Sequence, residues 1–397
     1  MAFAVNNRAV DPAEKAALLL FRIGLAILCI ILPVASVFSR RAIVVIAPIG
    51  AIILIMSAFM MKGHLDAVAR IKTTILSPAG MAAIFLIIWS AASLLWTPFP
   101  SPAAERLFRV VGTAGLAIAA IIALPHRMRA SNLYLLAMGV GLAALTALCV
   151  ILLKGHLGDP IVLERAAVLI TLLAWPAVTW LSIKQRSVAS MGISGGVGAL
   201  AIVLQGPAVL PALLTGAILL GGAMNNLRAA AVALMSAVTV LVMGAPLIAL
   251  ALSSLTPQES GFGRTMQIWA DVILADPTRL LTGHGLETAL RNRISQALDT
   301  LAPNSLLFEI WYELGLLGAM AMTCAIVFSI EKISRLGRVI GPFALGCMGF
   351  AFSLSIIGLS TSQTWWLTAL ATTCIAFAAV MNGEYRSPRV STVKERQ

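Results

Sequence analysis

The sequence GFGRTMQIWADVILADPTRLLTGHGLETALRNRISQALDTLAPNSLLFEIWYELGLLG spans residues 261–318 and holds the only long polar interval of an otherwise apolar chain. On both sides of it, apolar runs of about 20 residues, the length that crosses a bilayer, follow one another with short connections. A chain of this kind leaves the membrane in few places. We therefore expect residues 256–303 to form one long loop outside the bilayer, around which the fold is organised.

Composition places the chain among polytopic membrane proteins. Hydrophobic residues make up 60% of its 397 residues and charged residues 11%, which excludes a soluble globular domain. The net charge of +12 is dispersed over short connections, so it does not indicate a nucleic-acid partner. The five cysteines lie within apolar runs, and no Cys or His spacing typical of a metal site occurs. We expect no metal and no cofactor.

Hydropathy predicts an all-α fold of about twelve transmembrane helices in a single membrane domain over residues 1–397. The expected spans are 16–38, 42–61, 79–96, 108–125, 133–153, 163–181, 188–204, 208–224, 229–255, 304–330, 339–357 and 364–382. The first run is too long for a signal peptide. Most Lys and Arg fall in connections on one side, which the positive-inside rule makes cytoplasmic. Both termini are then cytoplasmic, and the loop over 256–303 faces the periplasm.

Two short amphipathic helices are expected within this loop. Over 264–274, Met266, Trp269 and Ile273 share one face. Over 286–298, an apolar stripe that begins at Leu286 lies opposite Glu287. Asp276-Pro277 ends the first helix, and Gly283 with Gly285 permits a tight turn before the second. Such helices suit the membrane surface or the roof of a cavity between spans.

Charged residues at the outer ends of the spans are the candidates for chemistry, because charges in a membrane usually have a function. Four of them form a possible external arginine cluster: Arg106, Arg109, Arg165 and Arg264. Converging guanidinium groups beside an apolar groove would suit a lipid diphosphate. The structural alternative is that each arginine only reaches toward a lipid headgroup and anchors the topology.

Glu309 and Glu313 lie four residues apart on one face of the tenth expected span. They could act as a general base, bind a sugar hydroxyl or pair with the arginines. The structural alternative is an ion pair that fixes helix packing. His284 is an external histidine between two glycines, and a lone loop histidine is usually only solvated.

The residue pattern of the loop resembles that of the bacterial O-antigen ligase and O-antigen polymerase family. Several positions carry the resemblance: Arg264, Trp269, Pro277, Gly283 and Gly285 at the opening of the loop, and Pro303, Ser305, Gly315 and Gly318 at its close. Trp96-Thr97-Pro98 is also similar. The layout matches over most of the chain, but the specific residues lie between 261 and 318.

The resemblance implies a metal-independent, inverting transfer of a glycan from undecaprenyl diphosphate to an acceptor, either lipid A core or another glycan, at the inner membrane. Arg264 would then bind the diphosphate. Two positions depart from the family pattern. Asn304 stands where the ligases have a histidine, and an amide cannot accept a proton at neutral pH. A second family arginine is absent, since Gly206 and Pro207 occupy its place.

We therefore expect a membrane glycosyltransferase in which Arg264, with Arg165, Arg106 and Arg109, binds phosphate. His284, Glu309 and Glu313 are the candidates for activating the acceptor hydroxyl, and Asn304 for holding a sugar. A ligase and a polymerase are not distinguished. The alternatives from other classes are a twelve-span transporter or lipid flippase, which would show broken helices or mid-membrane charges, and a non-catalytic assembly subunit.

Overall fold

The computed structural model describes residues 12–60, 65–125, 128–154, 159–204, 208–257 and 260–383, and these residues are almost entirely helical. In the first half the helices are α1 (Pro12–Ala26), the π-helical turn η1 (Ile27–Ile31), α2 (Leu32–Ser36), α3 (Ala42–Met60), α4 (Leu65–Ile75), α5 (Pro78–Ala92), the 3₁₀ turn η2 (Ser93–Leu95), α6 (Pro100–Ala123), α7 (Ala130–Lys154) and α8 (Pro160–Ile183).

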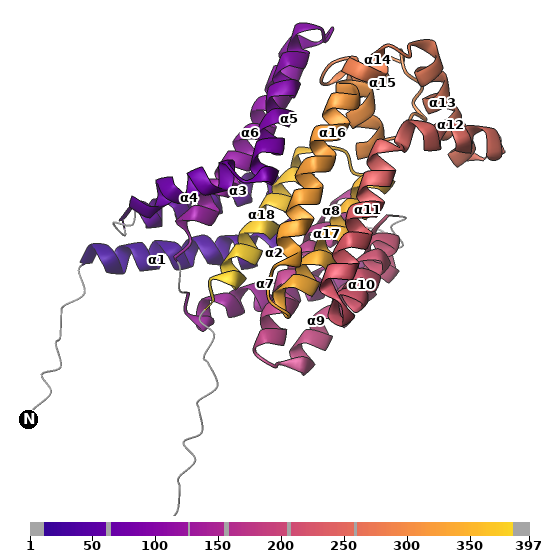
Figure 1. The fold of residues 1–397 in the computed structure, drawn as a ribbon. Coiled ribbons are helices and arrows are strands. Elements are labelled where there is room, and N and C mark those ends of the chain that lie inside the picture. Colours follow the sequence, from indigo (N-terminus) through magenta and orange to yellow (C-terminus); the bar gives the residue numbers. More distant parts are fainter. Residues whose placement is uncertain are drawn as a thin grey trace, which may run out of the picture.

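The second half contains α9 (Ser187–Leu204), α10 (Val209–Asn225), α11 (Leu227–Met243), α12 (Ala245–Leu255), α13 (Gly261–Ala275), α14 (Arg279–Thr282), α15 (Thr288–Ile294), α16 (Leu306–Ser334), α17 (Ile340–Ile357) and α18 (Thr364–Met381). Figure 1 shows α13, α14 and α15 gathered at one end of the helix bundle. No strand occurs in the part of the chain that the structure describes.

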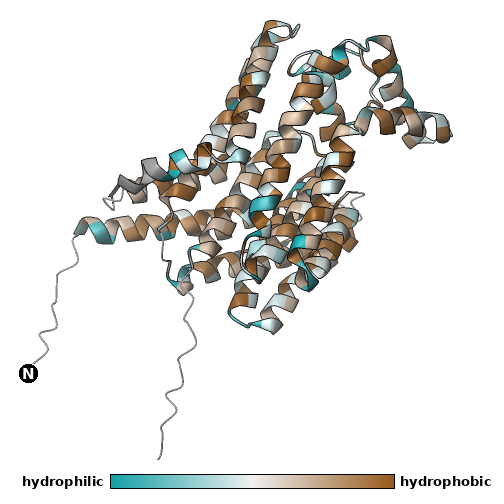
Figure 2. Ribbon diagram, in the orientation of Figure 1, coloured by the Kyte–Doolittle hydropathy of each residue, from teal (hydrophilic) through white to brown (hydrophobic). Residues whose placement is uncertain are grey.

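Ten of the helical segments in the described residues are long and apolar enough to cross a bilayer. Apolar residues also cover much of the outer surface, with Leu95 and Phe108 88% and 79% exposed, and hydrophobic residues dominate the helices in Figure 2. Water would strongly disfavour such a surface, whereas lipid tails would not. The expectation of an all-α, multi-pass membrane protein is confirmed, and the count of twelve spans stays a prediction.

The two expected spans outside those ten are α10, which is shorter, and the segment 229–255. The latter is not one straight helix, because α11 and α12 meet at an angle of 71°. Pro246 explains the bend: it has no N–H to donate to the carbonyl of Val242, four residues earlier. The indole Nε1 of Trp311, on α16, donates to that carbonyl at 2.7 Å instead.

The packed interior has two centres. Around α8, whose residues are buried over most of its length, pack α7, α9, α17 and α18. Around α16 pack α5, α11, α14 and α17, and Figure 1 shows α16 running beside α11. The second centre is the one that carries the loop helices, so it positions the candidate site.

The first loop helix, α13, ends before Asp276-Pro277 as the local sequence predicts. Ser260 caps α13, since its hydroxyl accepts the N–H of Gly263 at 3.0 Å. The expected apolar face of this helix is confirmed, because Met266, Trp269 and Ile273 are all buried. Over 286–298 the helix is shorter than expected, as α15 covers only Thr288–Ile294.

Candidate functional site

The site is built around a break in α16. Ser305 caps the helix by accepting the N–H of Phe308 at 3.3 Å, and the helix then runs to Gly315, whose φ of 64° and ψ of −158° interrupt it. A residue with a side chain rarely adopts this conformation, so glycine is required here. The break leaves the carbonyls of the preceding turn in need of donors.

The Gly-x-Gly turn and α5 supply those donors. The backbone N–H groups of His284 and Gly285 donate to the carbonyls of Tyr312 and Glu313 at 2.8 and 2.9 Å. The indole Nε1 of Trp89, on α5, donates to the carbonyl of Leu314 at 2.9 Å. The loop is therefore docked directly onto the broken helix.

The glycines allow this close approach. A Cβ on Gly283, whose φ is 74°, would lie 2.2 Å from the carbonyl oxygen of Glu313. One on Gly285, whose φ is 98°, would lie 2.7 Å from Thr97. The hydroxyl of Thr97 donates to the carbonyl of Leu286 at 2.9 Å. The three motifs that resemble the O-antigen family thus meet in space.

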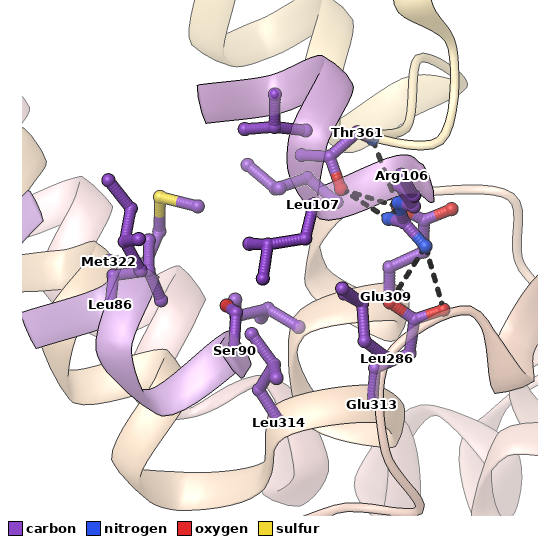
Figure 3. A pocket seen from close by; sticks show the side chains of 14 residues that line it. Leu86, Ser90, Arg106, Leu107, Leu286, Glu309, Glu313, Leu314, Met322 and Thr361 are labelled. Atoms are coloured by element: carbon purple, nitrogen blue, oxygen red, sulfur yellow. Dashed lines mark hydrogen bonds and ion pairs between the residues drawn. The ribbon is translucent and has the colours of Figure 1, made fainter. Parts of the chain in front are cut away.

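Arg106 lies at the centre of a buried charge network, and its side chain is only 4% exposed. Its Nη1 donates to both carboxylate oxygens of Glu313, at 3.0 and 2.9 Å, and lies 3.4 Å from Glu287. Its Nη2 donates to Glu309 at 3.2 Å and to the hydroxyl of Thr361 at 2.7 Å. Figure 3 shows the contacts of Arg106 with Glu309, Glu313 and Thr361 at one end of a pocket.

Two further arginines balance the charge of this network. Arg291 Nε lies 3.5 Å from Glu287, and the half-buried Arg293 interacts electrostatically with Glu309 and Glu313. Burial lowers the pKa of the Arg293 guanidinium, and the two carboxylates oppose that effect. Arg106, Arg291 and Arg293 therefore face three glutamates, and the formal charges cancel.

This network differs from the expected one. Glu309 and Glu313 lie on one face of α16 and pair with an arginine, which was one of the predicted arrangements. The helix expected over 286–298 does not place Leu286 opposite Glu287, because Glu287 precedes α15 as its N-cap and both side chains are buried. The left-handed backbone conformation of Glu287, with a φ of 72°, turns its side chain inward. No periodicity in a sequence indicates contacts between distant segments. Sequence patterns therefore do not identify four members of the network: Glu287, Arg291, Arg293 and Thr361.

An apolar pocket of about 100 Å³ leads to this network. It lies between α5, α6 and α16, and apolar side chains such as Leu86 and Met322 line the end opposite Arg106 (Figure 3). Arg106, Glu309, Glu313 and Thr361 line its polar end. An amphiphile with an apolar chain and a polar head matches this division.

The four expected arginines do not converge. Arg106 is held by the glutamates, whereas Arg109, on the same helix, lies 3.7 Å from Glu105 with its side chain 45% exposed. Arg165 lies over the ring of Trp365 at 5.3 Å from its centroid. Arg264 is exposed, and its nearest carboxylate, Asp299, is 4.0 Å away. Of the four arginines, Arg106 has the fewest N–H groups left to bind a ligand, and the side chain of Arg264 is the most exposed.

His284 lies against the opposite side of the α16 turn. Its ring stacks on Tyr312 with centroids 4.3 Å apart, and Nδ1 lies 3.0 Å from the Tyr312 carbonyl. A carbonyl can only accept, so Nδ1 carries the proton and Nε2 presents a lone pair. Burial lowers the pKa of His284, an effect that Arg279 supports and that the Tyr312 carbonyl opposes.

The neutral imidazole borders a small pocket formed by α13, α14 and α16. Its walls include Trp269, Trp311 and Tyr312, with Asp276 and Arg279 at the same pocket. Asn304 is exposed outside this pocket, where its side-chain oxygen accepts from Arg293 at 3.1 Å. His284, and not Asn304, therefore provides a group that can accept a proton.

Among the described residues, no group of three or more His, Cys, Asp or Glu side chains could hold a metal ion. The three glutamates of the network are occupied by arginines and by the backbone N–H groups of Ala289 and Thr361. Comparison of the chain with protein-family models and with curated proteins finds no match to either.

Proposed function

We propose that the protein is a bacterial inner-membrane glycosyltransferase of the O-antigen ligase type. In this proposal it transfers a glycan from undecaprenyl diphosphate to an acceptor sugar on the periplasmic side. A polymerase of the same type, in which another lipid-linked glycan is the acceptor, is the closest alternative. The observation that carries the proposal is His284, a neutral imidazole with an available Nε2 in an aromatic pocket beside the membrane.

The pocket around His284 suits a sugar. The side chains of Trp269 and Trp311 give this pocket apolar walls with polar groups nearby, and apolar walls of this kind pack against the C–H groups of a pyranose. Arg279 and Asp276 at the same pocket provide hydrogen-bond donors and acceptors for hydroxyl groups. The acceptor sugar is therefore assigned to this side of α16.

The donor lipid is assigned to the other side of the same turn, in the apolar pocket between α5, α6 and α16. Its apolar end suits an isoprenoid chain, and its exposed neighbours on α6, such as Phe108, border the lipid. Arg106 is saturated by carboxylates, so it holds the loop against α6 and does not bind the diphosphate. The diphosphate is assigned to Arg264 on the family resemblance, and Arg264 lies exposed on α13, outside the lining of both pockets.

The reaction is a single displacement. The acceptor hydroxyl oxygen attacks the anomeric carbon of the donor sugar and gives up its proton to Nε2 of His284. The bond between the anomeric carbon and the phosphate oxygen breaks, and undecaprenyl diphosphate leaves with the electron pair. Arg264 stabilises the charge that develops on the diphosphate. The configuration at the anomeric carbon inverts.

The test is a transfer assay with the purified protein in detergent micelles, using a lipid-diphosphate-linked glycan and a sugar acceptor. His284→Gln keeps a similar shape but has no basic nitrogen, so we expect turnover to fall about 10²–10⁴-fold. We expect Arg264→Ala to lower it about 10²–10³-fold. Arg335→Gln, whose side chain is 76% exposed at the far end of α16, is the matched control. Full turnover in His284→Gln would remove the proposal.

A lipid transporter is the second candidate, because α11 and α12 form a bent pair and α16 is interrupted at Gly315. Broken helices and buried charges such as Arg106 occur in transporters. The detergent assay separates the two functions, since a transporter has no membrane to work across and forms no product. Absence of product, together with lipid movement in vesicles that requires Arg106, would favour the transporter.

A further inference from the structure

A second polar pocket, of about 310 Å³, lies between the beginning of α8, the beginning of α10 and the connection from α17 to α18. Buried apolar side chains form part of its lining, among them Val168, Val209 and Leu354. Glu164 and Arg165 line it as well, and both are more exposed than the apolar residues. The pocket thus combines an apolar interior with a charged rim.

Within the described residues, neither of the two rim charges forms an ion pair. In the described parts of the chain, no carboxylate lies within 4.0 Å of Arg165 and no cation within 4.0 Å of Glu164, whereas the neighbouring Arg40 and Asp159 pair with each other. Arg165 lies over the ring of Trp365, and Trp365 Nε1 donates to Gln363 at 3.0 Å, which fixes the ring. The guanidinium is therefore oriented, but its N–H groups are available.

The charge pattern decides between ligands. A lipid diphosphate carries several negative charges, which Glu164 would repel. A zwitterionic headgroup carries one anionic phosphodiester and one ammonium group, which complement Arg165 and Glu164 respectively. Basic groups in pockets between membrane helices bind the phosphates of lipid headgroups. The apolar interior then receives the first part of the acyl chains.

We propose that this pocket binds one phospholipid with a primary ammonium headgroup, of the phosphatidylethanolamine class. The phosphate accepts hydrogen bonds from Arg165, and the ammonium donates to Glu164. The pocket also includes Gly358 and Gln363, and Thr361 between them donates to Glu309 through both its N–H and its hydroxyl. The bound lipid therefore supports the connection that holds the buried charge network. The proposal does not depend on glycan transfer.

Native mass spectrometry of the delipidated protein tests this proposal by titration with short-chain phosphatidylethanolamine, phosphatidylcholine and phosphatidylglycerol. We expect one phosphatidylethanolamine to bind at least tenfold more tightly than either other lipid. Arg165→Gln should weaken that binding about tenfold. Glu164→Gln should remove the preference over phosphatidylcholine, whose quaternary ammonium donates no N–H hydrogen bond. The control Arg335→Gln should bind like the unaltered protein.

Two results would overturn the proposal. One is equal binding of the three phospholipids, or equal binding of phosphatidylethanolamine by the unaltered protein and by Arg165→Gln. The other is tighter binding of farnesyl diphosphate than of phosphatidylethanolamine, lost in Arg165→Gln, which would make the pocket a lipid-diphosphate site. Gel filtration of each variant before titration checks that it is folded. The His284→Gln transfer assay is unaffected by either result.

Discussion

Replacement of Arg106 by methionine tests the role of the buried charge network. Methionine keeps the length and the apolar stem of the side chain but removes the guanidinium, which leaves Glu287, Glu309 and Glu313 around an uncharged group. Arg106 makes four hydrogen bonds of 3.2 Å or less, to Glu313 twice, Glu309 and Thr361. Each is a charge-assisted bond of about 1.5–3 kcal/mol.

The sum of these bonds overstates the effect, because taking the charges out of water offsets much of it. Removal of one partner from a buried ion pair costs about 3–5 kcal/mol, and we expect a loss of that size in the free energy of unfolding. The assay is denaturant unfolding in mixed micelles, followed by tryptophan fluorescence. Arg335→Gln removes an exposed pair with Glu331, so its effect should stay within about 0.5 kcal/mol.

A double-mutant cycle shows whether the loss comes from carboxylates left without a partner. Glu313→Gln in the Arg106→Met background removes one of those carboxylates. The double variant should therefore lose about 0.5–3 kcal/mol less in the free energy of unfolding than the sum of the losses in the two single variants. If Arg106→Met unfolds like the unaltered protein, or if the two changes are additive, the network does not hold the loop and the reasoning is refuted.

Three further predictions concern the loop and its contacts. Trp311→Phe leaves the Val242 carbonyl at the α11–α12 bend without its donor, and we expect a loss of about 1–3 kcal/mol in the free energy of unfolding. Gly283→Ala places a Cβ 2.2 Å from a backbone carbonyl of α16, so we expect faster proteolysis within the loop. Gly221→Ala, with no atom within 4 Å of its Cβ, is the control. Equal rates of cleavage in the two variants would count against a docked turn. The pKa of His284 in the folded protein lies below the ordinary value of 6.5, so the unfolded chain takes up the proton first as the pH falls. Stability should therefore decline below about pH 6.5, and it should decline less in His284→Gln. Parallel pH profiles for the two proteins would contradict this.

Much of the fold could be predicted from local sequence because a membrane imposes local rules. Apolar runs gave the helix positions, since each span must satisfy its own backbone hydrogen bonds in lipid. The 3.6-residue period placed Met266, Trp269 and Ile273 on the buried face of α13. One available signal was overlooked: Pro246 lacks the N–H that would bond Val242, which predicts the break between α11 and α12.

The site was less predictable, because its contacts join distant segments. Arg106 meets Glu287 across 181 residues and Glu313 across 207, and no helical period relates positions so far apart. The helical pattern expected over 286–298 does not place Glu287, because its left-handed backbone conformation puts it outside α15. Arg109 follows Arg106 by only three residues, yet it lacks these long-range contacts and its side chain is 45% exposed.

The sequence by itself determined that the chain is an all-α membrane protein, where most of its helices lie and which segment forms the polar loop, because burial of apolar runs and hydrogen bonding within a helix are local effects. Only the tertiary structure decided which arginine is saturated by carboxylates, which arginines remain available to a ligand, and which nitrogen of His284 carries the proton. Those properties depend on the distance and burial of groups from separate helices, and only the packed chain sets them.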